Sequence, residues 1–396
     1  MEIALYGGKK SSEEYIPYGK QWIDDEDINE VIKVLKSDYL TTGPKVLEFE
    51  KKVANYVGAK YAVAFSNGTA ALHAACFAAG VKECDEVITS PLTFAASANC
   101  ALYMGAKPVF ADVDLNNYNI DINDIKKKIT DKTKVIIPVD FAGQAVDIDK
   151  IMKIADENNL IVIEDAAHAL GSEYKGQKIG QKAHMTEFSF HPVKHITTGE
   201  GGIITTNDKD LYEKLKLFRT HGITRDKEFL NNKDKPSYYY EQIELGYNYR
   251  MTDIQCALGI SQLSKIDKFV QRRRDIVDIY NSELSSIDEI ITPYEEEYSK
   301  SSYHLYIIRL KLDKLKVDRD EIFKALQAEN IGVNVHYIPV YHHPYYQNLG
   351  YEKNLCENTE KIYNSIITLP LYPKMNDVEI KKVIEAVKKV INYYKK

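Results

Sequence analysis

Residues 160–170 read LIVIEDAAHAL, four apolar residues followed by two carboxylates. An uninterrupted run of Leu, Ile and Val is typical of a strand that is buried on both faces, as in a parallel sheet. Glu164 and Asp165 then lie at the carboxyl end of that strand, where open α/β sheets bind their ligands. A carboxylate in this position could keep a heteroaromatic nitrogen protonated, bind a metal, or only cap the following helix. The stretch therefore predicts an α/β fold with a candidate site at Asp165.

Four similar runs precede this strand, and stretches of helix length separate most of them. Such alternation predicts a mostly parallel central sheet whose strands are joined by helical crossovers. The expected strands are KYAVAF (60–65), DEVITS (85–90), KPVFADV (107–113) and KVIIPVDF (134–141), and the expected helices cover residues 69–80, 121–129 and 147–159.

The pattern changes after residue 170, which indicates a second structural unit further along the chain. Short β-like pieces lead to a helix over residues 208–222, and a long helical region then runs from Thr252 to Leu284. The remainder predicts strands over 303–312 and 333–340 and helices over 319–331 and 377–394. We expect a large α/β domain over residues 1–255, and a linking helix with a small C-terminal α+β domain over residues 256–396.

The composition of the chain argues against several classes of function. The 396 residues include 52 basic and 58 acidic side chains, for a net charge of -6, which gives no electrostatic reason to expect a nucleic acid or an anionic membrane as partner. The 5 cysteines contain no C-x-x-C pair, so neither a disulfide framework nor a zinc cluster is expected. The N-terminus has no signal-peptide core, and no apolar run reaches about 18 residues. We therefore expect a soluble, cytoplasmic protein without a metal site.

The segment AVAFSNGTAALHAA (62–75) reads as a strand, a tight turn and a helix. Gly68 and Thr69 at such a helix start would leave free N–H groups at the positive end of the helix dipole, where a phosphate binds. The alternative is an ordinary capped helix after a β-turn. The segment matches neither G-x-G-x-x-G nor a P-loop, which argues against a dinucleotide or a nucleoside triphosphate.

Lys194 lies in EFSFHPVKHITTGEGG (187–202), away from the charge-rich helices that hold most lysines of this chain. An enclosed lysine has a lowered pKa and can form a Schiff base with an aldehyde, whereas the alternative is a lysine whose ammonium group reaches solvent. A phosphate turn, an acid at a strand end and an enclosed lysine together are what pyridoxal phosphate requires. His168 alone is more often a hydrogen-bonded or stacking residue than a metal ligand.

Five segments resemble the motifs of the DegT/StrS family of sugar aminotransferases: SNGTAALHAA (66–75), TFAASANC (93–100), IEDAAHALGSEYKG (163–176), FSFHPVKHITTGEGG (188–202) and GYNYRMTDIQCALG (246–259). The resemblance implies a fold type I pyridoxal phosphate-dependent transferase, similar to aspartate aminotransferase. Lys194 would form the Schiff base and move the proton, and Asp165 would pair with the pyridine nitrogen. The other cofactor contacts that it implies are Gly68, Thr69 and Ser189 at the phosphate, Phe94 stacked on the ring, and His168 at the ring hydroxyl or in a stack.

The same resemblance implies a homodimer with shared active sites. Asn248 would reach the phosphate of the neighbouring subunit, and the alternative is a local turn residue before the helix near Thr252. The candidates for substrate contact, each with an ordinary structural role as the alternative, are Thr42, His221, Arg250, His336 and Tyr337.

Within the family, VDFAGQ (139–144), LFRTHGI (217–223), YHLY (303–306) and VHYIPVYHHPYYQ (335–347) are similar to the pseudaminic-acid branch. That similarity implies transfer of an amino group from L-glutamate to C4 of UDP-2-acetamido-2,6-dideoxy-β-L-arabino-hexos-4-ulose, giving UDP-4-amino-4,6-dideoxy-N-acetyl-β-L-altrosamine. The alternatives are another 4-keto or 3-keto nucleotide sugar, a sugar 3-dehydratase, or a non-catalytic binding protein. Lys194 argues against the dehydratase, because those relatives carry His at this position.

Overall fold

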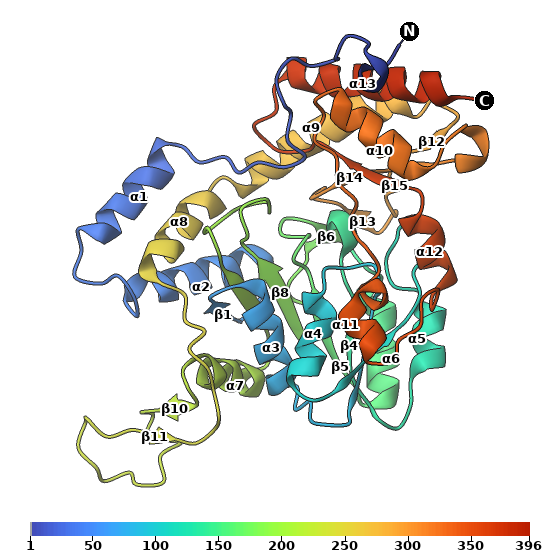
Figure 1. Ribbon diagram of the computed structural model, residues 1–396. Coiled ribbons are helices and arrows are strands. Elements are labelled where there is room, and N and C mark those ends of the chain that lie inside the picture. Colours follow the sequence, from blue (N-terminus) through green and yellow to red (C-terminus); the bar gives the residue numbers. More distant parts are fainter. Residues whose placement is uncertain (1) are drawn as a thin grey trace.

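A seven-stranded sheet lies at the centre of the computed structural model, which describes residues 2–396 (Figure 1). Four neighbouring pairs are parallel, and of the seven strands β9 alone runs against its neighbours, which confirms the mostly parallel sheet. In spatial order the strands are β1 (Tyr61–Phe65), β9 (Gly202–Thr206), β8 (Met185–Ser189), β5 (Ile161–Asp165), β4 (Thr133–Ile137), β2 (Glu86–Thr89) and β3 (Lys107–Phe110).

Helices cover both faces of this sheet, as buried parallel strands require. One apolar core contains residues of α3 (Gly68–Ala78), α4 (Ala96–Tyr103) and α7 (Lys209–Arg219). The core of the opposite face contains residues of α2 (Pro44–Val57), α5 (Ile122–Lys128), α6 (Ile148–Asn158) and α8 (Asp253–Leu263). The expected helices over 69–80, 121–129 and 147–159 correspond to α3, α5 and α6.

A third apolar core belongs to the small domain, which is drawn in gold, orange and red in Figure 1. Its sheet has the order β12 (Ile290–Ile291), β14 (Tyr306–Leu310), β15 (Ile366–Leu369), and its helices are α9 (Ile266–Leu284), α10 (Arg319–Ala328) and α13 (Asp377–Tyr394). Ile3 and Ile16 are buried in the same core, so the start of the chain packs with its end. The domain boundary between residues 255 and 256 remains a prediction.

Two segments differ from the sequence-based expectation. The helical region from Thr252 to Leu284 divides into α8 and α9, with Ser264 and Lys265 between them. Residues 333–340 do not form a strand: Asn334 alone makes a bridge, to Thr368. Their Val-rich pattern predicts a strand, but Val335 and Tyr337 instead pack against Leu92 and Phe141 of the large domain.

The remaining elements are short or lie at the surface: α1 (Asp25–Leu35), α11 (Pro344–Asn348), α12 (Glu357–Tyr363), β6 (Glu173–Tyr174), β7 (Gln177–Lys178), β13 (Ser299–Lys300), β10 (Ile223–Thr224) and β11 (Glu241–Gln242). The β10–β11 hairpin projects from the body of the molecule below α7 (Figure 1). Throughout residues 2–396, none of the helices combines the length and the apolar character that crossing a bilayer would need.

Candidate active site

Asp165 is the last residue of β5 and is buried, with 4% of its surface exposed. The hydroxyl of Ser97 on α4 donates to its Oδ2 at 2.6 Å, and the amide of Ala167 donates to its Oδ1 at 3.2 Å. Burial raises the pKa of Asp165, while these two donors and the charge of Lys194 oppose that rise. The chain therefore fixes the orientation of this carboxyl and supplies donors that favour its ionised form.

Lys194 lies in the connection between β8 and β9 and is half-buried. Burial lowers the pKa of its amine to about 8, although the charges of Asp165 and Glu187 act in the opposite direction. Among residues 2–396 we find no hydrogen-bond or ion-pair partner for this amine. An amine with such a pKa is partly neutral near physiological pH, so it can act as a nucleophile and exchange protons.

Gly68 and Thr69 form the first turn of α3, close to the end of β8. Asn67 caps this helix by accepting from the amide of Ala70 at 2.8 Å. The amides of Gly68 and Thr69 precede the intrahelical hydrogen bonds and stay available at the positive end of the helix. Ser189 is adjacent, since a Cβ added at Gly68 would lie 3.4 Å from its Cβ. These residues form a cradle that suits a phosphate.

Phe94, Tyr337 and His168 form an aromatic wall at the junction of the two domains. The ring of Phe94 is 63% exposed and lies 6.3 Å from that of Tyr337. Tyr337 Oη lies 3.0 Å from Nε2 of His168, while Nδ1 of His168 accepts from the amide of Ala142 at 3.3 Å. Both nitrogens of His168 thus have partners within the chain, namely Tyr337 and the amide of Ala142.

His336 is buried next to this wall. Its Nδ1 lies 2.8 Å from Oγ1 of Thr368, and burial together with the charge of Lys194 lowers its pKa to about 3. The buried residues His195 and His304, which sequence reasoning missed, also have pKa values well below the usual range because of burial. The histidines around Lys194 are therefore neutral at physiological pH.

The predicted cofactor contact Asn248 and the other predicted substrate contacts lie elsewhere. Asn248 and His221 are exposed in adjacent segments, which are joined by the bridge between Thr220 and Asn248 and by the hydrogen bond from the His221 amide to Tyr247 O at 2.9 Å. Arg250 follows in the same segment. Thr42 is exposed in the loop before α2, where Gly43 donates to Asp253 at 2.7 Å. The structure thus brings His336 and Tyr337 toward Lys194, and it leaves Thr42, His221, Asn248 and Arg250 at the surface.

Two residues that sequence reasoning missed touch the centre of the site. Ser97 orients Asp165, and Glu187 is fully buried between Asp165 and Gly68. A signal for Glu187 was available, because it is the only charged residue in the strand MTEFS and lies two positions before Ser189, which puts both side chains on one face.

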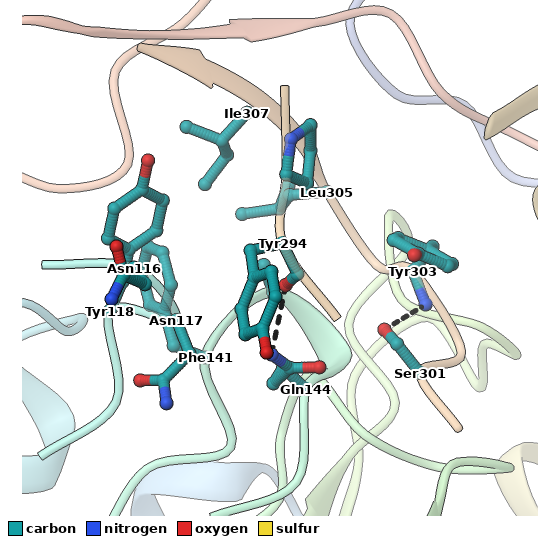
Figure 2. Close-up of a pocket in the computed structure, with 12 residues that line it drawn as sticks. Asn116, Asn117, Tyr118, Phe141, Gln144, Tyr294, Ser301, Tyr303, Leu305 and Ile307 are labelled. Atoms are coloured by element: carbon teal, nitrogen blue, oxygen red, sulfur yellow. Dashed lines mark hydrogen bonds between the residues drawn. The ribbon is translucent and has the colours of Figure 1, made fainter. Parts of the chain in front are cut away.

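A cavity of about 30 Å³ is lined in part by Phe141 (Figure 2). Tyr118, Tyr294 and Leu305 are among the residues that line it, and Gln144 donates across it to the backbone of Tyr294 at 3.0 Å. Its lining contains no carboxylate, amine, thiol or imidazole. The cavity therefore lacks groups that could carry the chemistry, and the candidate site is the cluster around Lys194.

The residues present fit pyridoxal phosphate. A free amine, an oriented carboxyl, an open helix N-terminus and a largely exposed aromatic ring lie around one space, and they correspond to the aldehyde, ring nitrogen, phosphate and ring face of the cofactor. Phe94 in particular leaves apolar surface exposed that a bound ring would cover.

Comparison with known proteins agrees with this geometry. Residues 21–388 match the DegT/DnrJ/EryC1/StrS aminotransferase family. The chain is 41% identical over 384 residues to the UDP-4-amino-4,6-dideoxy-N-acetyl-β-L-altrosamine transaminase of Campylobacter jejuni, a match that covers 96% of this chain and 99% of that protein.

Solved structures agree as well. Helicobacter pylori PseC, an aminotransferase involved in the biosynthesis of pseudaminic acid, superposes with a TM-score of 0.90 at 33% identity, covering 96% of this chain and 100% of the other. Spr1654 of Streptococcus pneumoniae in its pyridoxal phosphate form superposes with a TM-score of 0.88 at 33% identity, covering 96% and 99%. Fold and site thus define a pyridoxal phosphate-dependent aminotransferase. The chain belongs to the DegT/DnrJ/EryC1/StrS aminotransferase family.

Proposed function

We propose that this enzyme transfers the amino group of L-glutamate to C4 of a UDP-linked 4-keto-6-deoxy sugar. The proposed acceptor is UDP-2-acetamido-2,6-dideoxy-β-L-arabino-hexos-4-ulose, and the product is UDP-4-amino-4,6-dideoxy-N-acetyl-β-L-altrosamine, for pseudaminic acid synthesis. The observation that carries the reaction class is that Lys194, whose pKa is lowered to about 8, lies close enough to the buried carboxyl of Asp165 for their charges to interact. The acceptor is supported by the similarity to the C. jejuni altrosamine transaminase and to H. pylori PseC.

The chain's own residues divide the work between holding the cofactor and moving protons. Bound pyridoxal phosphate supplies an aldehyde that condenses with amines and a protonated ring that withdraws electrons from the adjacent carbon. Lys194 would hold the aldehyde end of the cofactor, and its Nζ would accept and return the proton that moves during the transfer. Asp165 keeps the ring nitrogen protonated through electrostatic stabilisation, without itself transferring a proton.

Gly68, Thr69 and Ser189 anchor the phosphate end, so that the reacting carbon stays within reach of Lys194. Phe94 covers one face of the ring and excludes water from it. Tyr337, held by His168, and the neighbouring His336 then stand beside Lys194, where the sugar would enter. Because His336 is neutral, it would recognise the sugar by hydrogen bonding and not by charge.

We further propose that two copies of the chain share their active sites. Asn248, His221 and Arg250 belong to a surface segment next to the β10–β11 hairpin, and exposed apolar side chains in the same region suit an interface. The most exposed of them are Leu245 at 74% and Tyr238 at 72%. In a dimer, Asn248 would reach the phosphate of the neighbouring subunit, with His221 and Arg250 at its sugar nucleotide; Thr42, in the loop before α2, is a fourth candidate for substrate contact.

The test is a mass-spectrometric assay with ¹⁵N-labelled L-glutamate and purified UDP-linked 4-keto sugars of different stereochemistry. The proposal predicts that ¹⁵N enters the β-L-arabino-configured acceptor most efficiently, as measured by kcat/KM, and that Lys194→Ala abolishes the transfer. Labelling only of a different 4-keto or 3-keto sugar would replace the proposed acceptor. Consumption of a ketosugar without nitrogen transfer would indicate the dehydratase reaction, and binding without turnover would indicate a binding protein.

A further inference from the structure

Glu187 occupies an unusual place for a carboxyl group. It lies in the middle of β8, is fully buried, and its strand neighbours across the sheet are Asp165 on β5 and Ile204 on β9. Neither of its two carboxyl oxygens has a hydrogen-bond donor among the residues that the structure describes. A buried ionised carboxylate without donors is very costly, so such a group is normally paired or protonated.

The carboxyl of Glu187 points into the cofactor site. In-register neighbours of a parallel sheet direct their side chains to the same face, which places Glu187 beside Asp165. A Cβ added at Gly68 would lie 2.6 Å from Oε1 of Glu187, so the same carboxyl reaches the start of α3. Glu187 therefore lies directly between the group proposed for the ring nitrogen and the cradle proposed for the phosphate.

Two facing carboxyls can form a hydrogen bond only if one of them carries a proton. Burial and the charge of Asp165 both raise the pKa of Glu187 well above its usual range, and Lys194 lowers it only in part. Asp165 differs because Ser97 and Ala167 already donate to it, and these bonds favour its ionised form. The proton between the two acids therefore belongs to Glu187.

We propose that Glu187 is a positioning residue, which carries a proton and donates it as a hydrogen bond to Asp165. An ionised carboxylate has about four acceptor positions. Ser97, Ala167 and Glu187 would fill three of them, which leaves one for the N–H of the pyridine ring. Glu187 thereby keeps Asp165 ionised and aimed at the ring without touching the reacting atoms.

The other charged or titratable groups around the pair are consistent with this assignment. Those that interact with Asp165 or Glu187 are Asp140 after β4, Cys100 on α4, Lys194 after β8 and Tyr337 of the small domain. Burial raises the pKa of Asp140 and Tyr337, and a hydrogen bond with Cys76 together with burial raises that of Cys100, so the neutral forms of all three are favoured. Lys194 is the one cation among these groups, and its charge lowers the pKa of both carboxyls. The donors Ser97 and Ala167, which only Asp165 has, therefore decide which of the two acids is ionised.

Two substitutions at Glu187 test whether its side chain acts as a hydrogen-bond donor or as a negative charge. Glu187→Gln keeps a neutral side chain of the same shape with an N–H donor, whereas Glu187→Met keeps the approximate volume and removes the donor. The measurement is the dissociation constant of pyridoxal phosphate as a function of pH, followed by absorbance. At low pH, protonation of Asp165 should weaken cofactor binding, and we call this part of the pH curve the acid limb. We expect the acid limb to lie at the same pH in the wild type and in Glu187→Gln. In Glu187→Met that limb should move to higher pH by about 1–2 units, because Asp165 loses a hydrogen bond to its ionised form.

Glu164→Gln is the matched control. Glu164 is a buried glutamate next to Asp165 in sequence, but Thr186 donates to its Oε2 at 2.9 Å and its side chain points to the opposite face of the sheet. This variant should leave the acid limb of cofactor binding where it is in the wild type.

A direct readout covers the case in which Glu187→Met fails to fold. The infrared difference spectrum between the wild-type apoprotein and Glu187→Gln at pH 7 should contain the carbonyl band of a protonated carboxyl. A carboxylate band in its place would show Glu187 to be ionised and would overturn the proposal. An acid limb that moves equally in the Gln and Met variants, or in neither, would also overturn it. Each readout is independent of the sugar acceptor.

Discussion

The hydroxyl of Ser97 donates a hydrogen bond of 2.6 Å to Oδ2 of Asp165 and so connects helix α4 to the end of strand β5. Oγ1 of Thr93 lies 2.8 Å from the same hydroxyl and extends the network. The carboxyl proposed for the cofactor nitrogen is therefore held from a second element of the fold. Its rotamer is set by packing before any cofactor binds, which is the preorganisation that electrostatic catalysis needs.

Ser97→Ala should weaken cofactor binding. A hydrogen bond to a charged group contributes about 1.5–3 kcal/mol, so the dissociation constant of pyridoxal phosphate should rise by roughly tenfold or more. Titration by absorbance measures this change. Ser261→Ala, which removes a buried hydroxyl on α8, is the control and should bind like the wild type. Equal affinity of the Ser97 variant and the wild type would show that this bond does not position Asp165 for the cofactor.

Phe94→Ala should also weaken cofactor binding, but by a different route. The ring is 63% exposed, so its removal should change the free energy of unfolding of the apoprotein by less than about 0.5 kcal/mol. The lost ring contact should raise the cofactor dissociation constant by about three- to tenfold. Tyr345→Ala removes an aromatic ring that is 62% exposed elsewhere and should alter neither quantity. A large loss of apoprotein stability in Phe94→Ala would indicate a structural role.

Lys194→Met should stabilise the apoprotein at neutral pH. Burial lowers the pKa of Lys194 from 10.5 to about 8 on folding, so the unfolded chain binds more protons between these values. Burying the charged amine lowers the free energy of unfolding of the wild type by on the order of 2–3 kcal/mol, and this loss is present in full below about pH 8. The loss disappears as pH rises toward 10.5. Urea unfolding of both apoproteins at several pH values measures the difference. An advantage of the variant that grows with pH would contradict the sign of this pKa shift.

The sequence predicted the large-domain strands and the cofactor cluster because both leave local signals. A run such as LIVIEDAA marks a buried strand and its polar end together, and parallel topology then brings Asp165 toward Lys194 and Gly68. The roles of Ser97 and Glu187 depend on the order of the strands in the sheet. That order cannot be predicted from the sequence of any single segment. Residues 333–340 have the composition of a strand, but most of the segment lacks a partner strand. His336 and Tyr337 therefore lie at the site in a segment without regular secondary structure.

Leu245→Asp should disrupt self-association if the region around the β10–β11 hairpin forms the dimer interface. The side chain is 74% exposed in the single chain, so the substitution should not affect folding of the subunit, whereas a buried interfacial charge is strongly unfavourable. Size-exclusion chromatography with light scattering gives the mass. Leu349→Asp, at a leucine that is 48% exposed elsewhere, should keep the wild-type mass. A wild-type protein that is monomeric and fully active would exclude the shared site.

The attachment of the cofactor tests the central claim most directly. Purified protein is loaded with pyridoxal phosphate, reduced with borohydride and digested, and the peptides are mapped by mass spectrometry. The account predicts a pyridoxyl group on the peptide that contains Lys194, and loss of the group when L-glutamate is added before reduction. A pyridoxyl group on another lysine, or labelling that persists in Lys194→Ala, would contradict it.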